Sequence, residues 1–441
     1  MSILGIAWRS IRQRPLTSGL TALSLALGVA LVVATLVTAG IVKRTFASGA
    51  GLGYNMIVGA KGSPLQLVLN SVYYVSKPIE NIPWSFYQEF LPAAERPDGS
   101  AGRFAGSVET AVPICMGDYF RGYRVVGTNA AFFSRLTPGY GRTFRFSAGA
   151  NFRDDDFFAG VIGATVAESL GLRVGDTFAP THGADDGLEH DPFRVVGIVD
   201  RTGTPVDRGV FVNMEGFYLQ EGHAKPVTDA GPDAAAPAPV PSAGGTGDKP
   251  APLPFAEREV TAILICTAAV AGLQDVTAMV LTQTINEGRD GQAAAPVLVI
   301  SELFELFVRP LELVLLLVTA LVVLVSAIGI LVSMVGSALE RSRDVAVMRA
   351  LGARRTHVLA AVLVEALLLA VGGGLAGWLL GHLVVGGIGP WITKYSGVSV
   401  SLFSAAPLQE MLLVPFMIGV AILAGILPAL AAYRTDVAKW L

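Results

Sequence analysis

The sequence predicts a membrane protein with four transmembrane α-helices and a large extracytoplasmic α+β domain between the first and the second helix. Of its 441 residues, 52% are hydrophobic and only 15% are charged, which is too apolar for an ordinary water-soluble chain. The apolar residues also gather into four long runs, each with at least the roughly 20 residues that cross a bilayer. The predicted helices cover residues 17–42, 311–339, 358–385 and 412–432.

Residues 1–16 are predicted to form a cytoplasmic amphipathic segment ahead of the first helix. Arg9, Arg12 and Arg14 precede the apolar run, as they would in a signal peptide. The apolar part of a signal peptide is only about 7–15 residues long, however, and this run is much longer. We therefore expect an uncleaved membrane anchor.

The basic residues beside the helix ends predict the orientation of the chain. Lys and Arg gather in the N-terminal tail, in the loop after the second helix and in the tail 433–441, whereas the loop 386–411 holds only Lys394. Both termini and the basic loop should therefore be cytoplasmic, with residues 43–308 on the other side. The net charge of −3 argues against nucleic-acid binding, which needs a broad basic face.

Residues 43–308 are numerous enough for a substantial α+β domain. Strands are predicted where β-branched residues gather, and helices where apolar residues recur at helical spacing. The predicted strands are 124–127, 193–199, 209–212, 261–266 and 297–300, and the predicted helices are 163–170, 273–285 and 301–308.

Two stretches of this domain differ from the rest. Residues from about 224 to 254 are mainly Ala, Pro, Gly and Asp, so we predict a disordered insertion. Residues 51–90 are rich in Tyr, Pro and apolar side chains; ordinary core is the preferred interpretation, and an exposed groove for a hydrophobic ligand is the alternative. The two cysteines, Cys115 and Cys266, are as compatible with one disulfide as with two separate buried thiols.

Motifs for chemistry on this chain are missing. The Gly-x-x-x-x-Gly-Lys-Ser/Thr phosphate loop is absent, as are the serine-hydrolase elbow and the His-Glu-x-x-His zinc motif. The chain should therefore be non-catalytic and hold no cofactor. His182, His190 and His223 lie near several carboxylates and are the only metal candidates, but their spacing matches no standard site. A solvated polar loop is the preferred interpretation, so no metal is expected.

The predicted third helix contains one ionisable residue near its cytoplasmic end, Glu365. Structural pairing with Arg354, Arg355 or His357 is favoured over an ion or proton site. Small residues recur every four positions in the first and third helices, a pattern that lets helices pack closely. These residues are Ala22, Ala26, Ala30 and Ala34, and Gly373, Gly377 and Gly381.

Residues 340–355, between the second and third helices, form a short basic segment. Ser342 suits a helix N-cap and Gly352 suits its end, while Val345, Met348 and Leu351 form an apolar stripe. Such a stripe favours docking by a cytoplasmic partner, and contact with lipid headgroups is the alternative. The residues on which this prediction rests are Glu340, Arg341, Arg343, Asp344, Val345, Met348, Arg349, Leu351 and Gly352.

This segment resembles the cytoplasmic loop of MacB/FtsX-like ABC transporter permeases, whose pattern is roughly E-R-x-R-E-I-A-x-L-R-A-L-G-A. The tail 427–434 resembles the closing motif of that family, and residues 7–12 resemble its N-terminal segment. Residues 163–176 and 193–212 are similar to the MacB periplasmic core domain. Residues 51–90 and 224–254 match no part of the family pattern.

The resemblance implies a multi-pass protein of the bacterial inner membrane that transmits mechanical force. A cytoplasmic ABC ATPase dimer, which carries ATP and Mg²⁺, would bind the 340–355 coupling segment and move the periplasmic domain. That movement would export or extract a lipid, lipoprotein or efflux cargo, with membrane lipid, a second permease and a periplasmic adaptor or lipoprotein as partners. The alternative is an FtsX-like regulator that activates an extracytoplasmic enzyme without moving cargo.

Overall fold

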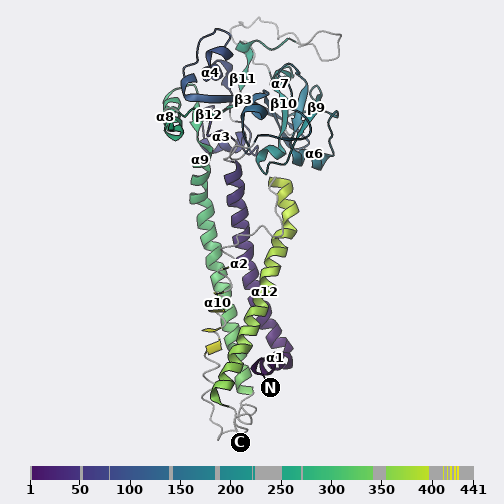
Figure 1. Ribbon diagram of the computed structural model, residues 1–441, viewed down its shortest axis with the longest axis vertical. Helices are drawn as coiled ribbons and strands as arrows, with labels where there is room; N and C mark the ends of the chain where they lie inside the picture. Colours follow the sequence, from purple (N-terminus) through teal and green to yellow (C-terminus); the bar gives the residue numbers. More distant parts are fainter. Residues whose placement is uncertain are drawn as a thin grey trace. The chain divides into compact units, whose positions relative to one another are not determined.

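The computed structural model describes residues 2–49, 53–78, 80–138, 143–183, 189–220, 222–223, 251–269, 272–340 and 354–396, with scattered positions between 411 and 426. The chain forms two compact units (Figure 1). Met1–Lys43 and Glu305–Leu441 make up the helical unit, and Arg44–Phe304 makes up the α+β unit.

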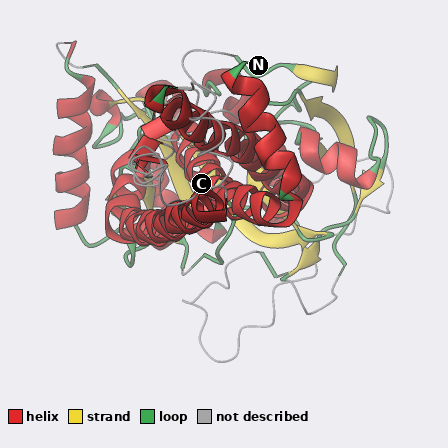
Figure 2. Ribbon diagram, turned by 90° about the horizontal axis from the view of Figure 1, so that it is seen from below, coloured by secondary structure: helices red, strands yellow, loops and turns green. Residues whose placement is uncertain are grey.

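The helical unit contains α1 (Ile3–Gln13), α2 (Pro15–Gly49), α10 (Arg309–Glu340) and α12 (Arg355–Ser396). Figure 1 shows the three long helices running side by side, and Figure 2 shows α1 lying crosswise to them. Three helical stretches among the described residues are long and apolar enough to cross a membrane: Pro15–Ile41, Pro296–Gly329 and Thr356–Trp391. The predicted fourth span, 412–432, lies mostly outside the described residues.

The helices extend beyond the predicted spans, and α2, for which 17–42 was predicted, runs from Pro15 to Gly49. The first helix begins at Pro15, because proline is well tolerated at the first helical position, where no N–H is needed. The third helix was expected to stop at residue 385, before a Gly-Gly pair and a proline. Instead α12 continues through Pro390 to Ser396, so part of the predicted loop 386–411 is helical. Glycine lowers helix stability by only about 1 kcal/mol, which an apolar environment can outweigh.

The α+β unit is built around an 11-stranded mixed sheet with the order β13-β1-β12-β3-β4-β10-β6-β9-β5, to which β7 and β8 add at the side. Strands β2 and β11 form a separate pair. The strands are β1 (Met56–Gly59), β2 (Ile82–Pro83), β3 (Val108–Phe120), β4 (Tyr123–Thr128), β5 (Phe146–Gly149), β6 (Ala159–Ile162), β7 (Thr177–Phe178), β8 (Thr181–His182), β9 (Phe193–Val199), β10 (Val210–Asn213), β11 (Glu259–Val260), β12 (Ala262–Thr267) and β13 (Gln292–Ala294).

Short helices cover both faces of this sheet. They are α3 (Pro64–Ser71), α4 (Trp84–Gln88), α5 (Ala131–Arg135), α6 (Ala164–Leu170), α7 (Met214–Tyr218), α8 (Gln274–Glu287) and α9 (Pro296–Leu303), with 3₁₀ turns at Ala93–Glu95, Ala105–Ser107, Pro205–Arg208 and Phe255–Glu257. A π-helical turn, Phe304–Val308, joins α9 to α10.

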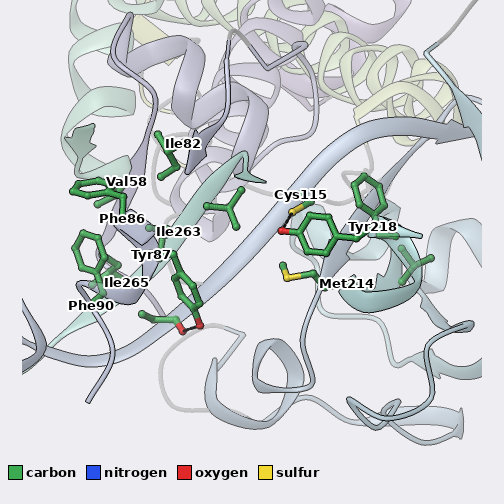
Figure 3. Close-up of a cluster of buried hydrophobic side chains, with 14 of the residues drawn as sticks. Val58, Ile82, Phe86, Tyr87, Phe90, Cys115, Met214, Tyr218, Ile263 and Ile265 are labelled. Carbon is green, nitrogen blue, oxygen red and sulfur yellow. Dashed lines mark hydrogen bonds between the residues drawn. The ribbon is translucent and has the colours of Figure 1, made fainter. Parts of the chain in front are cut away.

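Both faces of the sheet are buried. Successive side chains of a strand point to opposite faces, so neighbours in the sequence belong to different cores. Val58 and Ile263 belong to one core, which Figure 3 shows together with Phe86 and Phe90 of the α4 region. Ile57 and Leu264, their immediate neighbours in the sequence, belong to a second core on the other face. The preferred interpretation of 51–90 as core is thereby confirmed.

The strands predicted at 124–127, 193–199, 209–212 and 261–266 agree with β4, β9, β10 and β12 to within one or two residues. The strand predicted at 297–300 is wrong, because these residues lie in α9, whose first position is Pro296. Of the predicted helix 301–308, the first residues end α9 and the rest form the π-helical turn. Residues 224–250 lie outside the described residues, and Leu253, which the predicted insertion included, is buried in the core.

The two cysteines are separate free thiols and not a disulfide, but only Cys115 is buried, while Cys266 is partly exposed. Cys266 on β12 lies opposite Thr110 on β3, five positions from Cys115 along the same strand. At about 3.3 Å per residue, the two cysteines are much farther apart than a disulfide permits. The Cys115 sulfur instead lies 3.2 Å from the Tyr218 hydroxyl (Figure 3).

Candidate functional site

The predicted coupling segment lies outside the described residues, except for its first position. Glu340 is the last residue of α10, and the chain is described again at Arg354, immediately before α12. Arg341, Arg343, Asp344, Val345, Met348, Arg349, Leu351 and Gly352 therefore remain a prediction. The helices on either side of the segment, by contrast, show how it is connected to the rest of the helical unit.

The two small-residue stripes face each other in a seam between α2 and α12. A methyl group on Gly373 would lie 2.8 Å from the carbonyl oxygen of Ala22, and one on Gly381 would lie 2.9 Å from that of Ala30. A methyl group on Gly377 would meet Val29 Cβ at 2.7 Å and the Ala26 carbonyl oxygen closer still. The backbones of α2 and α12 thus approach as closely as glycine allows.

Helix α1 packs on the same end of α12 at which the coupling segment enters. Ser10, which is buried, donates a 2.5 Å hydrogen bond to Glu365 Oε2, while Trp8 on another side of α1 is half exposed. The partner of Glu365 is thus a hydroxyl of α1 that the sequence analysis did not consider. This bond between two helices is in keeping with a structural role for Glu365.

A cavity of about 310 Å³ lies between α2 and α10. Its lining is mainly apolar, with Ala34 of the small-residue stripe on the α2 side and Leu311 and Leu315 on the α10 side, and Glu312 adds one carboxylate. The fourth alanine of the stripe therefore faces a space between helices, whereas the first three alanines meet α12.

Within the α+β unit, the three histidines singled out from the sequence converge on one carboxylate, that of Asp118 on β3. A β-bulge between Met116 and Tyr119 interrupts the pairing of β3 with β4 at this residue. Bulges of this kind redirect side chains and recur beside functional sites. Strand β8 pairs with the same part of β3 and places His182 directly opposite Asp118.

The other two histidines reach Asp118 from neighbouring turns. The His190 amide donates to the Pro180 carbonyl at 2.9 Å, which returns the chain alongside β8. His223 follows α7 in a turn closed by a 3.3 Å bond from its amide to the Gln220 carbonyl. The Gln220 side chain joins the two turns, because it bonds both the amide and the carbonyl of Asp191, at 2.8 and 3.3 Å.

The four side chains bring their polar atoms very close together. Asp118 Oδ1 lies 3.3 Å from His182 Nδ1 and 3.2 Å from His223 Nε2, and these two nitrogens are 3.3 Å apart. Asp118 Oδ2 lies 3.5 Å from His190 Nε2. No two of the four donor atoms are more than 4.8 Å apart, so the group offers one ligand atom from each residue to a cation.

This cluster is largely buried, contrary to the expected solvated loop. The side chains of His190 and His223 are 1% and 4% exposed and that of Asp118 is fully buried, while His182 is 44% exposed. Burial raises the pKa of Asp118, but the nearby His190 and His223 outweigh that effect and lower it to about 2. The carboxylate is therefore ionised at neutral pH. A cavity of about 250 Å³ reaches the cluster at His182 and His223.

Asp118 is the member of this cluster that the sequence analysis missed. It lies far from the histidines in the sequence, inside a strand that was not predicted. The one local indication was an acidic residue between Met116 and Tyr119 in an otherwise apolar and aromatic stretch.

The architecture and the family comparisons define the class of the protein: a membrane-embedded permease component with a large periplasmic domain. The MacB-like periplasmic core domain matches residues 18–238, which is half of the chain, and the FtsX-like permease C-terminal domain matches residues 316–437. The chain belongs to the family of MacB/FtsX-like permeases, as its motifs suggested. No curated protein matches the chain.

Proposed function

We propose that this chain is the permease subunit of a MacB-type ABC transporter and transmits force from a cytoplasmic ATPase to its periplasmic domain. The ATPase is a separate dimer that carries ATP and Mg²⁺, and it docks on the segment 340–352. A second permease, identical or related, completes the transporter. The periplasmic domain then acts on a lipid, lipoprotein or efflux cargo, with an adaptor or lipoprotein as an additional partner.

The observation that carries this proposal is the packing around α12. This helix starts directly after the coupling segment, contacts α1 through the Ser10–Glu365 bond, and contacts α2 along the glycine seam. Because interlocked helices move together more easily than they slide, displacement of the segment would be passed to α2. Helix α2 in turn leads into the periplasmic domain at Arg44.

The cargo is proposed to have an apolar part. The cavity between α2 and α10 is lined mainly by Ala, Leu and Val side chains and has a volume in the range of small-ligand sites. This lining suits an acyl chain better than a polar solute. The FtsX-like regulator is not favoured, because the match at residues 18–238 is to the MacB-like periplasmic core domain.

Introduction of a negative charge into the apolar stripe tests the docking step. Met348→Glu and Leu351→Glu should each reduce co-purification of the ATPase, and its stimulated hydrolysis, by at least about tenfold, since burying an unpaired carboxylate in the contact costs more than about 1.4 kcal/mol. Val174→Glu is the matched control, because Val174 is an exposed valine in the periplasmic domain. If both stripe variants bind and stimulate the ATPase as the control does, docking does not occur on this stripe.

A further inference from the structure

The geometry of Asp118, His182, His190 and His223 suggests a function that force transmission does not need. Three of the five histidines of the chain meet at a single buried carboxylate. They come from β8, from the turn before β9 and from the turn after α7, while the carboxylate comes from β3. Convergence of four separate segments on one point is typical of a binding site rather than of chance surface polarity.

The distances among three of the four donors agree with the edges of a tetrahedral metal site. Zn–N and Zn–O bonds of about 2.0–2.1 Å place neighbouring ligand atoms of a regular tetrahedron about 3.3–3.4 Å apart. Asp118 Oδ1, His182 Nδ1 and His223 Nε2 form a triangle with sides of 3.3, 3.2 and 3.3 Å. The fourth donor, His190 Nε2, lies 3.5 Å from the other oxygen of the same carboxylate.

A hydrogen-bonded His–Asp cluster without metal is the competing arrangement, and the burial of the polar atoms argues against it. Neither oxygen of Asp118 nor Nε2 of His190 makes a hydrogen bond of acceptable geometry with any described residue. A buried carboxylate whose oxygens receive no well-aligned hydrogen bond is strongly unfavourable. A bound divalent cation would neutralise the charge of this carboxylate and accept the lone pairs of the imidazole nitrogens.

The donor set distinguishes among cations. Three imidazoles and one carboxylate suit Zn²⁺, whereas Mg²⁺ and Ca²⁺ prefer oxygen ligands. The nearly equal sides of the triangle of three donors also favour Zn²⁺ over Cu²⁺, which prefers a planar arrangement. The cavity at His182 and His223 gives the ion a route to the site.

We propose that Asp118, His182, His190 and His223 bind a Zn²⁺ ion in the periplasmic domain. The ion fixes β8 and the turns that hold His190 and His223 to the bulge of β3. Gln220 acts as a positioning residue, since it holds the segment beside His190 against the turn that carries His223. The site would make the stability of this side of the periplasmic domain dependent on zinc supply.

Zinc binding is tested on the full chain in detergent, purified without a polyhistidine tag, stripped with a chelator and titrated with Zn²⁺. The expected result is one Zn²⁺ per chain, a higher unfolding temperature with Zn²⁺ but not with Mg²⁺ or Ca²⁺, and the visible absorption of tetrahedral Co²⁺ after cobalt substitution. Absence of stoichiometric zinc binding by the folded wild-type chain would overturn the proposal.

Single substitutions locate the site. His182→Gln, on the exposed side of the cluster and so the least disruptive to folding, should weaken zinc binding by at least about 100-fold, since loss even of an outer-shell partner costs about 10–100-fold. Gln220→Ala should weaken it by about 10–100-fold and leave one ion per chain. His357→Gln is the control, because His357 is an exposed histidine of α12. Equal affinities for His182→Gln and His357→Gln would refute the assignment of these ligands.

Discussion

Replacement of Gly377 by alanine offers the most direct test of the seam between α2 and α12. The new methyl group would lie 2.7 Å from Val29 Cβ and closer to the Ala26 carbonyl oxygen, and no flexible side chain is there to move aside. The two helices must therefore separate or bend. Overpacking of this kind costs about 1–3 kcal/mol in well-packed protein interiors.

Gly372→Ala is the matched control for this substitution. It introduces the same methyl group into the same helix, but no described atom lies within 4 Å of that position. Both variants gain about 1 kcal/mol of helix propensity, so this gain cancels in the comparison. The difference between them measures the steric term alone.

Thermal unfolding of both full-length variants in detergent, followed by tryptophan fluorescence, gives the comparison. At about 2–4 °C per kcal/mol, Gly377→Ala should unfold roughly 2–12 °C below Gly372→Ala. Equal unfolding temperatures would show that α2 and α12 are not in tight contact, and the transmission route proposed above would lose its basis.

Three other predictions rest on single contacts. Burial raises the pKa of the Cys115 thiol from 9.0 to about 12, so its thiolate is about a thousandfold rarer at pH 8. Mass spectrometry should therefore find Cys115 unalkylated in the folded chain and alkylated after denaturation. Alkylation of the folded chain should increase at higher pH. Arg258, whose side chain is 4% exposed, pairs with Glu215 at 2.8 Å. Arg258→Met should lower the unfolding free energy in denaturant titrations by about 2–3 kcal/mol. This is less than the roughly 3–5 kcal/mol expected for a fully buried pair, because Glu215 is 23% exposed. Glu365→Gln should change the unfolding free energy by less than about 1 kcal/mol, because the amide oxygen can still accept a hydrogen bond from Ser10. Glu365→Leu should lower the unfolding free energy by more. Loss of ATPase stimulation in the Gln variant alone would instead favour a proton site.

The sequence was sufficient where a pattern is local. Long apolar runs identified α2, α10 and α12, because a run of that length with at most one charged residue is rare outside membrane-spanning helices. Strand β9 was placed to the residue, since its β-branched run lies between clear turn residues. Strand β3 was missed, because Pro113 and Gly117 interrupt its pattern of strand-forming residues. The strand nevertheless continues through both of them and is 13 residues long. Helix α9 was mistaken for a strand because a short apolar run has no decisive period.

The seam between α2 and α12 and the histidine cluster could not be predicted from the sequence, because each depends on which distant segments the fold brings together. The small-residue stripes were visible in the sequence, but nothing local states that Gly377 meets Ala26 rather than a second permease. Likewise, the histidines were visible, but their spacing resembles no known metal motif. The fourth member, Asp118, approaches them only because β8 pairs with β3 at a bulge.

The histidine cluster and the Arg258 pair occupy the two ends of the same insertion, and this gives the proposed zinc a structural purpose. The insertion begins directly after His223. At its other end, Arg258 Nε donates to the Leu253 carbonyl at 2.7 Å, while its guanidinium pairs with Glu215 of α7. Both ends are thus tied to the neighbourhood of α7, one by a salt bridge and the other by the proposed ion. The disorder that the sequence predicts for residues 224–254 would make it costly in entropy to fix both ends of the segment, so each attachment would matter for the sheet beside it. Removal of zinc should accordingly increase proteolysis near His223 more than near Leu253, and equal protection of both ends without zinc would contradict this role.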